Sequence, residues 1–247
     1  MTDFPATLRR WRQTRRYSQL ALSLDADVSA RHISFLETGR ARPSREMVAR
    51  LGEAMNLPLT ARNELLSHAG FAPRYEARDW DDAAMAPVRS AVEYMLGAHD
   101  PYPGLALDRI WNIVSMNASA TRLFGAFGVT KGQSLLTPML SGAIAQVVEN
   151  WPSVASAAAS RLRIESAAAG GIAELDDAAS RLSNQGTDAP SNGPVIPTIV
   201  QLGGMRLSMF ATIAQFGTPE DLALDDLKVE LYFPSDDDTK AFFAATQ

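Results

Sequence analysis

The most constraining feature of the sequence is a pair of short helical segments joined by a very short connection. The segment QLALSLDAD follows Ser18, and the segment ARHISFLETG follows Ser29 and ends at Gly39. Serine is a preferred N-cap residue of helices, and glycine commonly ends them. Because little more than DADV connects the two apolar segments, the helices must cross steeply, which leaves the second on the surface. This geometry is that of a helix-turn-helix, whose second helix enters the DNA major groove.

Three further short helices are predicted around this pair. The segment FPATLRRWRQTRR precedes it, with Leu8 and Trp11 on its inner side. Ser44, after Pro43, is the N-cap of a helix with four apolar residues at helical spacing: Met47, Val48, Leu51 and Met55. Pro58 and Thr60 introduce a last helix, ARNELLSHAG. Five short helices joined by tight turns are therefore expected over about the first seventy residues.

The charges are distributed unevenly along the chain. Residues 1–78 contain 13 arginines, no lysine and 8 acidic residues, a net charge of +5. The remainder contains 10 basic and 20 acidic residues, a net charge of −10. Nucleic acids are bound by cations that neutralise phosphates, so only the N-terminal part is electrostatically suited to this role. From charge alone, an equally good interpretation is that the arginines solvate helix surfaces.

The segment SQLALSLDADVSARHISFLETGRARPS resembles the phage-repressor-like (Xre-type) helix-turn-helix family. The resemblance covers roughly residues 5–70 and rests on caps, core positions and a closing glycine that coincide. The matching positions are Ser18-Gln19, Ile33 and Leu36 in the core, Glu37-Thr38-Gly39 and Pro43-Ser44. Ser23 departs from the alanine that is usual in the family for close helix packing. This change is mild and leaves the assignment intact.

The resemblance implies which residues contact double-stranded operator DNA. Four residues would face base edges, namely Ala30, Arg31, Ser34 and Phe35. Arginine can bond guanine O6 and N7, and phenylalanine can contact a thymine methyl group. Phosphates would be held by Gln19, Ser29, Arg40 and Arg42. Alternatives stay open at this point: Ser29 as a cap only, Phe35 tucked against a neighbouring helix, and Arg40 as a solvated loop residue.

The region after the fifth helix has the composition of a linker. GFAPRYEARDWDD begins at Gly70, with proline, charges and no periodicity. A helix is predicted at Met85–Gly97, with Val88, Val92, Met95 and Leu96 on one side, packing against the C-terminal body or against a second copy. We therefore expect a DNA-binding domain at residues 1–72, a linker and connecting helix at 73–100 and a second domain at 101–247.

The second domain is predicted to be α+β. Strands are expected at Leu105–Leu107, Trp111–Met116, Val195–Leu202, Arg206–Phe216 and Leu224–Phe233, with a helix at Asn117–Phe124. The alanine-rich section from Gln133 to Ser183 predicts helices broken at Trp151-Pro152 and Gly170-Gly171, and Ser183–Pro194 predicts a loop. In the last strand Leu227, Val229, Leu231 and Phe233 alternate with Lys228, Glu230 and Tyr232, which favours one buried face. These elements predict a mainly antiparallel five-stranded sheet with helices on one side.

Two stretches of this domain are similar to the ligand-binding domain of MmyB-like transcription regulators. They are YPGLALDRIWNIVSMNASATRLFG and RLSMFATIAQFGTPEDLALDDLKVELYFP. The resemblance implies a PAS-like sensor domain after an Xre-type helix-turn-helix, and it covers nearly the whole chain. The middle, Leu135–Ser183, matches the family only in general character.

A PAS-like sheet with helices across it is expected to enclose an apolar cavity. Nine residues are placed near it, on inner strand faces or the adjoining helix: Trp111, Ile113, Met116, Phe124, Phe127, Met139, Leu207, Met209 and Ile213. These residues with few charges suit a small hydrophobic ligand such as a fatty acid or another fatty-acyl-like molecule. For any one of them, an ordinary core position is the alternative. No cofactor is expected, since the domain offers no well-placed histidine or cysteine for a haem.

The sequence offers little support for catalysis, metal binding or membrane insertion. There is no cysteine, and His32, His68 and His99 are scattered. No glycine-rich phosphate loop follows a strand, and the carboxylate pairs have no histidine near them. No apolar run approaches the ~18 residues of a membrane span, and a cytoplasmic protein is expected.

These features predict a one-component transcription regulator and not an enzyme. A symmetric operator is read by two DNA-binding domains together, so a homodimer is the default expectation. The alternative is a DNA-binding regulator whose C-terminal domain only dimerises or recruits another protein, without a ligand.

Overall fold

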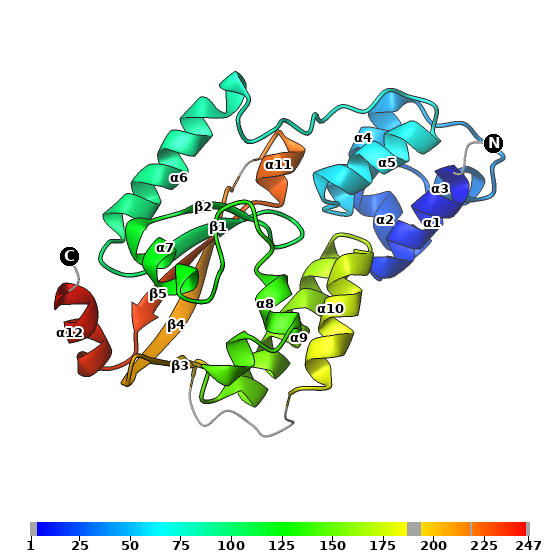
Figure 1. Cartoon of the computed structure of the whole chain (residues 1–247). Helices are drawn as coiled ribbons and strands as arrows, with labels where there is room; N and C mark the ends of the chain where they lie inside the picture. Colours follow the sequence, from blue (N-terminus) through cyan, green and yellow to red (C-terminus); the bar gives the residue numbers. More distant parts are fainter. Residues whose placement is uncertain (1–3, 187–193, 218, 246–247) are drawn as a thin grey trace. The chain divides into compact units, whose positions relative to one another are not determined.

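The computed structural model describes residues 4–186, 194–217 and 219–245 (Figure 1). The chain divides into two compact units, with the main boundary between Ala77 and Arg78. The loop predicted at Ser183–Pro194 falls mostly on residues 187–193, which lie outside the described residues. No helix in the described ranges is long and apolar enough to cross a membrane.

The N-terminal unit is the expected succession of five helices over residues 4–68. Their bounds are α1 Phe4–Thr14, α2 Gln19–Asp25, α3 Ala30–Glu37, α4 Arg45–Ala54 and α5 Leu59–His68. The three predicted serine caps are present, since the side chains of Ser18, Ser29 and Ser44 accept hydrogen bonds from backbone N–H groups three residues later, at 2.9–3.2 Å. The last helix begins two residues earlier than predicted, directly after Pro58, where proline fixes the entry of the chain.

The core of this unit is formed by apolar side chains from all five helices. Those with at most 2% of their surface exposed include Leu8, Trp11, Leu22, Ile33, Leu36, Leu51 and Leu65. Between α2 and α3 the chain turns at Asp27, whose φ of 51° is left-handed. Ser23 is buried within α2, and its hydroxyl group donates to the Leu20 carbonyl oxygen at 2.7 Å. The serine is therefore tolerated because its polar group is paired inside its own helix.

The C-terminal unit is built on a five-stranded antiparallel sheet, as far as the chain is described. Its strands are β1 Gly104–Leu107, β2 Ile113–Met116, β3 Thr198–Leu202, β4 Met205–Gln215 and β5 Lys228–Pro234. They are arranged in the order β2-β1-β5-β4-β3. The strand β5 therefore lies at the centre of the sheet, between β1 and β4, with Glu230 paired to Leu105 on one side and to Ile213 on the other.

Three predicted strands are too long at their N-terminal ends. The strand β2 begins at Ile113 because Trp111 has a left-handed φ of 65°. The strand β3 begins at Thr198, after Pro197, which has no N–H group for a sheet. The strand β5 begins at Lys228, because Leu224 and Asp225, predicted as the start of the last strand, end the short helix α11, Leu222–Asp225. Each error lies at a boundary, where local backbone geometry overrides the apolar pattern.

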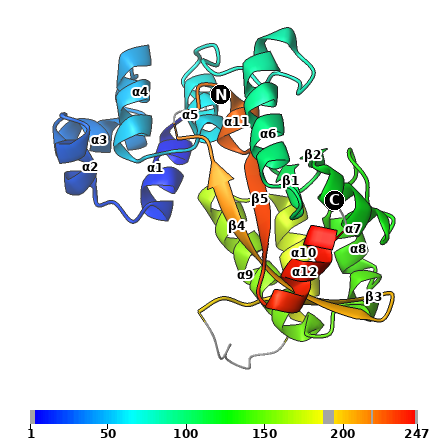
Figure 2. The ribbon, with the colours of Figure 1, turned by 90° about the vertical axis from the view of Figure 1, so that its left-hand side faces the viewer.

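Helices cover both faces of the sheet, whereas the sequence predicted helices on one side. They are η1 Ala83–Met85, α6 Ala86–Ala98, α7 Ala118–Gly125, α8 Leu136–Leu140, η2 Ile144–Gln146, α9 Trp151–Ala168, α10 Ala173–Ser183 and α12 Asp237–Ala245. Figures 1 and 2 show the sheet between α6 and α12 on one side and α9 and α10 on the other. The His99 ring lies 4.8 Å from the Phe233 ring on the first side, and Glu165 binds Lys228 on the second. The predicted breaks at Trp151-Pro152 and Gly170-Gly171 bound α9.

Candidate DNA interface and ligand cavity

Four of the predicted DNA-contacting residues share one face of α3. Ala30, Arg31, Ser34 and Phe35 are spaced so that they lie over successive turns of the helix. Arg31 is exposed, and the other three are half-buried. The inner side of the same helix is formed by Ile33 and Leu36 (both 0% exposed). The fold therefore fixes which side of α3 is presented to solvent.

Phe35 lies within reach of two guanidinium groups. The Cζ atom of Arg31 is 5.2 Å from the centre of the Phe35 ring, and that of Arg40 is 6.0 Å away. Such contacts are worth about 0.5–1 kcal/mol at exposed sites. The sequence suggested that Phe35 either contacts a base or packs on a neighbouring helix. The structure adds a role as the platform on which Arg31 rests.

The carboxylate of Glu37, at the end of α3, is the centre of a buried polar cluster. It accepts hydrogen bonds from Arg12 Nε at 2.5 Å, from Arg12 Nη2 at 3.0 Å and from Gln19 Nε2 at 2.9 Å, and its side chain is 1% exposed. Burial alone would raise the Glu37 pKa, but the hydrogen bonds from Arg12 and Gln19 and the charges of Arg12 and Arg9 outweigh it and lower the pKa. The carboxylate is therefore ionised at neutral pH.

The predicted phosphate contacts differ in how they are held. The amide nitrogen of Gln19 binds Glu37, so this side chain is oriented from within the protein. Ser29 is exposed, and its hydroxyl oxygen accepts from the His32 N–H group as the cap of α3. Arg40 and Arg42 are exposed in the segment between α3 and α4. All eight predicted residues thus belong to α3, the start of α2 or the chain next to α3.

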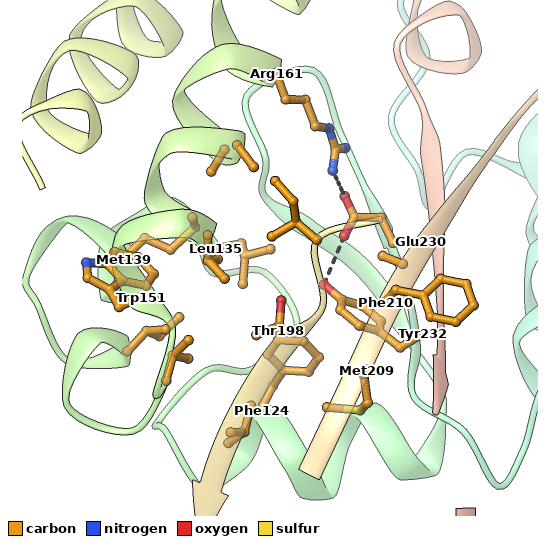
Figure 3. A pocket seen from close by; sticks show the side chains of 18 of the residues that line it. Phe124, Leu135, Met139, Trp151, Arg161, Thr198, Met209, Phe210, Glu230 and Tyr232 are labelled. Atoms are coloured by element: carbon orange, nitrogen blue, oxygen red, sulfur yellow. Dashed lines mark hydrogen bonds and ion pairs between the residues drawn. The ribbon is translucent and has the colours of Figure 1, made fainter. Parts of the chain in front are cut away.

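The C-terminal unit contains an apolar cavity of about 430 Å³ between the sheet and α7–α9. Figure 3 shows Phe124, Leu135, Met139 and Trp151 on its helical side, facing Met209 and Tyr232 on the strands. Several of the remaining lining residues are aliphatic, among them Leu123, Ile144, Val148, Val154 and Val200. A volume of this size falls within the range of small-molecule sites, which is about 300–1,000 Å³.

Six of the nine residues predicted near a cavity do line it. They are Trp111, Phe124, Phe127, Met139, Met209 and Ile213. Ile113 and Leu207 do not, because each packs in the core with 1% of its surface exposed. Met116, half-buried at the end of β2, is also absent from the lining. The structure therefore places these three residues in the core or on a strand, outside the cavity lining.

The sequence prediction missed the polar end of the cavity. Arg161 from α9, Thr198 from β3 and Glu230 and Tyr232 from β5 also line it. The alternating pattern of β5 placed Lys228, Glu230 and Tyr232 away from the buried face, yet Lys228 is 6% and Glu230 2% exposed. This expectation was wrong because a central strand covered by helices on both faces has no solvent side. The sequence indicated this burial only weakly, because Lys228 and Glu230 stand among apolar residues in KVELYF.

Five side chains form a connected network at this end, which we call the Arg161 cluster: Trp111, Arg161, Glu165, Lys228 and Glu230. Arg161 Nη1 lies 2.5 Å from Glu230 Oε1, and Arg161 Nε donates to Glu165 Oε1 at 2.8 Å. Glu165 Oε2 also accepts from Lys228 Nζ at 2.6 Å and from Trp111 Nε1 at 2.8 Å. The guanidinium group of Arg161 stacks on the Trp111 ring at 4.5 Å. The cluster therefore links α9 to β5 and to Trp111, which precedes β2 and has a left-handed φ.

The surroundings of Glu165, Arg161 and Tyr232 shift the pKa values of these three groups. Burial would raise the Glu165 pKa, but the hydrogen bond from Lys228, the charge of Arg161 and the bond from Trp111 lower it overall. Burial would lower the Arg161 pKa, but Glu230 and Glu165 raise it. The Tyr232 hydroxyl donates to Glu230 Oε2 at 3.0 Å, and burial together with Glu230 raises the Tyr232 pKa well above its usual value. Tyr232 therefore remains neutral, while Arg161 and Glu165 remain charged.

The cavity is open where its apolar lining reaches the surface. Val195, Ile196 and Ile213 all line it, and they are 48%, 38% and 47% exposed. The exposed part of the cavity lining is therefore apolar, whereas the Arg161 cluster lies at the polar end.

Family comparisons match both units of the chain. Residues 3–65 match the family described as a helix-turn-helix domain. Residues 88–245 match the family described as the MmyB-like transcription regulator ligand binding domain. Among curated proteins, none matches the chain.

Proposed function

The chain belongs to the family of the MmyB-like transcription regulator ligand binding domain, and we propose that its cavity binds a small hydrophobic ligand of fatty-acyl type that alters DNA affinity. The chain is a DNA-binding transcription regulator with a ligand-binding domain, and not an enzyme. The nature of the ligand, the DNA contacts and the assembly are what we infer from the site.

The observation that supports a hydrophobic ligand is the lining of the cavity. Its helical side and most of its strand side are apolar, and its two charged lining residues, Arg161 and Glu230, already pair with each other. Removing apolar surface from water stabilises a complex by about 25 cal/mol per Å². A long alkyl chain would gain this along the length of the cavity. The rim formed by Val195, Ile196 and Ile213 offers such a chain an apolar entrance.

We expect a neutral long-chain compound to raise the melting temperature of the C-terminal unit. A ligand that binds only the folded state adds RT ln(1 + [L]/Kd), about 2.7 kcal/mol at a hundredfold excess over Kd. For a unit of this size the shift is about 5–10 °C. Differential scanning calorimetry measures it, and the fluorescence of Trp111 and Trp151, which both line the cavity, reports binding separately.

A matched pair of variants tests whether the compound occupies this cavity. Ile213 and Met205 lie on the same strand with similar exposure (47% and 44%), but only Ile213 lines the cavity. Ile213→Glu should abolish most of the thermal shift, whereas Met205→Glu should leave it unchanged. If operator affinity also changes with the compound, it is a regulatory ligand, because a ligand shifts an equilibrium only when it prefers one state. Stabilisation without a change in DNA affinity would indicate a structural lipid site.

We propose that α3 reads bases and that its neighbours hold phosphates. Arg31, placed on the Phe35 ring, is the candidate for guanine recognition. Ala30, Ser34 and Phe35 share its face of the helix. Gln19, Ser29, Arg40 and Arg42 are the candidate phosphate contacts, supported by the net charge of +5 over residues 1–78.

The variants Arg31→Ala and Arg40→Ala should separate these two roles. Arg31→Ala should cost about 1–3 kcal/mol on the preferred site and relax the preference at one base position. Arg40→Ala should weaken binding to all sequences alike and reduce the salt slope by about one unit. Selection of preferred sites from a random DNA pool, followed by salt titrations, measures both. An unchanged preferred site in the Arg31 variant would assign that residue to the solvated helix surface.

We also propose that the regulator acts as a homodimer. Two helix-turn-helix heads related by a twofold axis read operator half-sites about 34–36 Å apart. Sedimentation of the full-length protein with and without operator DNA tests this, and a single protein chain bound per operator would contradict it. A C-terminal domain that serves only for dimerisation would give a dimer with no compound bound in the thermal assay.

A further inference from the structure

The polar end of the cavity restricts the head group of the ligand. Its lining there consists of Arg161, Thr198, Glu230 and Tyr232. We propose that the cavity selects alkyl ligands whose buried polar group is uncharged, such as a hydroxyl or a carboxamide, over those with a carboxylate or a phosphate. This inference rests on the proposed binding of a hydrophobic ligand and names the chemistry of its head group.

Arg161 has no unpaired charge to offer an anion. Its Nε and Nη1 atoms face the carboxylates of Glu165 and Glu230, at 2.8 Å and 2.5 Å. The only other cation of the cluster, Lys228, binds Glu165 at 2.6 Å. Two cations and two carboxylates leave no net formal charge. An anionic head group could accept only from Arg161 Nη2, and the charge of that guanidinium group already faces Glu165 and Glu230. It would lose its hydration without gaining a cation of its own, which is unfavourable in a buried site.

Glu230 adds a direct repulsion. Its side chain is 3% exposed and lines the cavity, and one of its oxygens already accepts a hydrogen bond from the Tyr232 hydroxyl group. A ligand carboxylate placed beside Tyr232 would therefore meet a second carboxylate across a hydroxyl group whose single proton is in use. Like charges at short distance repel strongly in a buried environment, where little water screens them. The arrangement discriminates against acids rather than selecting them.

An uncharged head group can be fully paired at the same place. The Tyr232 hydroxyl group donates its hydrogen bond to Glu230, and its oxygen can still accept one from a ligand. The Thr198 hydroxyl can donate or accept, and Figure 3 shows it directed toward the same space as the Tyr232 hydroxyl. Arg161 Nη2 has no hydrogen-bond partner within the part of the chain that is described. A hydroxyl or carboxamide group, with both donor and acceptor atoms, matches these groups.

The test compares three compounds with the same alkyl chain on the full-length protein: decanol, decanamide and decanoate. At pH 8, titration calorimetry and the tryptophan fluorescence should give dissociation constants roughly tenfold or more lower for the alcohol and the amide than for the anion. As the pH falls toward the pKa of decanoic acid, its affinity should increase because the neutral acid forms. The affinity of decanol should stay constant over the same range.

Glu230→Gln provides the test on the protein side. It removes the repelling carboxylate and leaves the positive charge of Arg161 without its Glu230 partner. The dissociation constants of the neutral compounds and of decanoate should therefore become nearly equal, or decanoate should bind more tightly. Glu149→Gln is the matched control, because Glu149 pairs with Arg206 on the surface at 3.0 Å and does not line the cavity. The control should keep the selectivity of the unchanged protein. The pH series on the unchanged protein gives an answer even if Glu230→Gln does not fold.

The outcomes distinguish this inference from the function on which it rests. Decanoate binding at pH 8 as tightly as decanol would overturn the head-group selectivity while leaving a hydrophobic ligand in place. Selectivity that Glu230→Gln and Glu149→Gln both retain would overturn the role of Glu230. If none of the three compounds bound, both the proposed ligand and the head-group inference would be overturned.

Discussion

Glu37→Gln is expected to destabilise the N-terminal unit by about 3 kcal/mol. The substitution removes the charge that pairs with Arg12 inside the protein, where the Glu37 side chain is 1% and the Arg12 side chain 13% exposed. Removing one partner of a buried ion pair costs about 3–5 kcal/mol, because the remaining charge has lost its hydration. The residual exposure of Arg12 places the value at the lower end. Hydrogen exchange of peptides from residues 4–68 in the full-length protein measures this local stability.

The effect of Glu37 should depend on pH in a defined direction. Its pKa is lowered in the folded state, because the bonds from Arg12 and Gln19 outweigh burial. Its contribution is therefore fully present above the unfolded carboxyl pKa, about 4.3, and is lost as the pH falls through the lower folded value. The difference between the unchanged protein and Glu37→Gln should be constant from about pH 6 to pH 8 and decrease below about pH 4.

Glu64→Gln is the matched control for this prediction. Glu64 pairs with Arg10 near the surface, with side chains 33% and 47% exposed, and a glutamine can still accept from Trp11 Nε1. This variant should lose less than about 1 kcal/mol. Equal losses of stability in both variants would show that the burial of the Glu37 ion pair does not determine the size of the effect. We also expect Glu37→Gln to weaken DNA binding, because the glutamine has a single acceptor oxygen for which Arg12 and Gln19 must compete, so Gln19 is held less firmly.

Asn117→Ala is expected to destabilise the C-terminal unit by about 3–5 kcal/mol. The Asn117 side chain is the N-cap of α7, and its oxygen accepts from the backbone N–H groups of Gly104 and Ala120 at 3.0 and 2.8 Å. Its amide nitrogen donates to the carbonyl oxygens of Leu96 and Tyr102 at 3.0 and 2.8 Å. Alanine would remove the side-chain partner of the Gly104 and Ala120 N–H groups and of the Tyr102 carbonyl oxygen, at about 1–3 kcal/mol each before water or structural relaxation compensates. The Leu96 carbonyl oxygen keeps its bond from the His99 N–H group.

Calorimetry of the C-terminal transition measures the loss, and Gln133→Ala is its control. Gln133 is exposed, and its side-chain oxygen accepts a single backbone N–H group, that of Thr130, at 2.9 Å. The control should lose less than about 1 kcal/mol. Because α7 contributes Leu123 and Phe124 to the cavity, Asn117→Ala should also weaken binding of hydrophobic compounds. Unchanged stability of this variant would mean that water replaces the amide at little cost.

The N-terminal unit could be predicted almost completely from the sequence, because its signals are local. The caps Ser18, Ser29 and Ser44 bond to groups three residues away, so each helix start is determined within one short segment. Leu22, Ile33 and Leu36 follow the helical period, and this period alone assigns them to the core. From the sequence, Glu37 could be assigned only a stabilising role at the end of α3. Its partners Arg12 and Gln19 come from other helices, 25 and 18 residues away along the chain.

In the C-terminal unit the sequence determined the elements and the alternation of side chains along β5, but not which side is exposed. Alternation places Glu230 and Tyr232 opposite Val229 and Leu231 whatever the fold. Whether the charged side meets water depends on the neighbours of the strand, and only the order β2-β1-β5-β4-β3 with helices on both faces decides this. Arg161 and Glu230 are 69 positions apart in the sequence and 2.5 Å apart in the structure. Contacts between such distant residues depend on how the sheet and α9 pack together, so the tertiary structure alone created the polar end of the cavity.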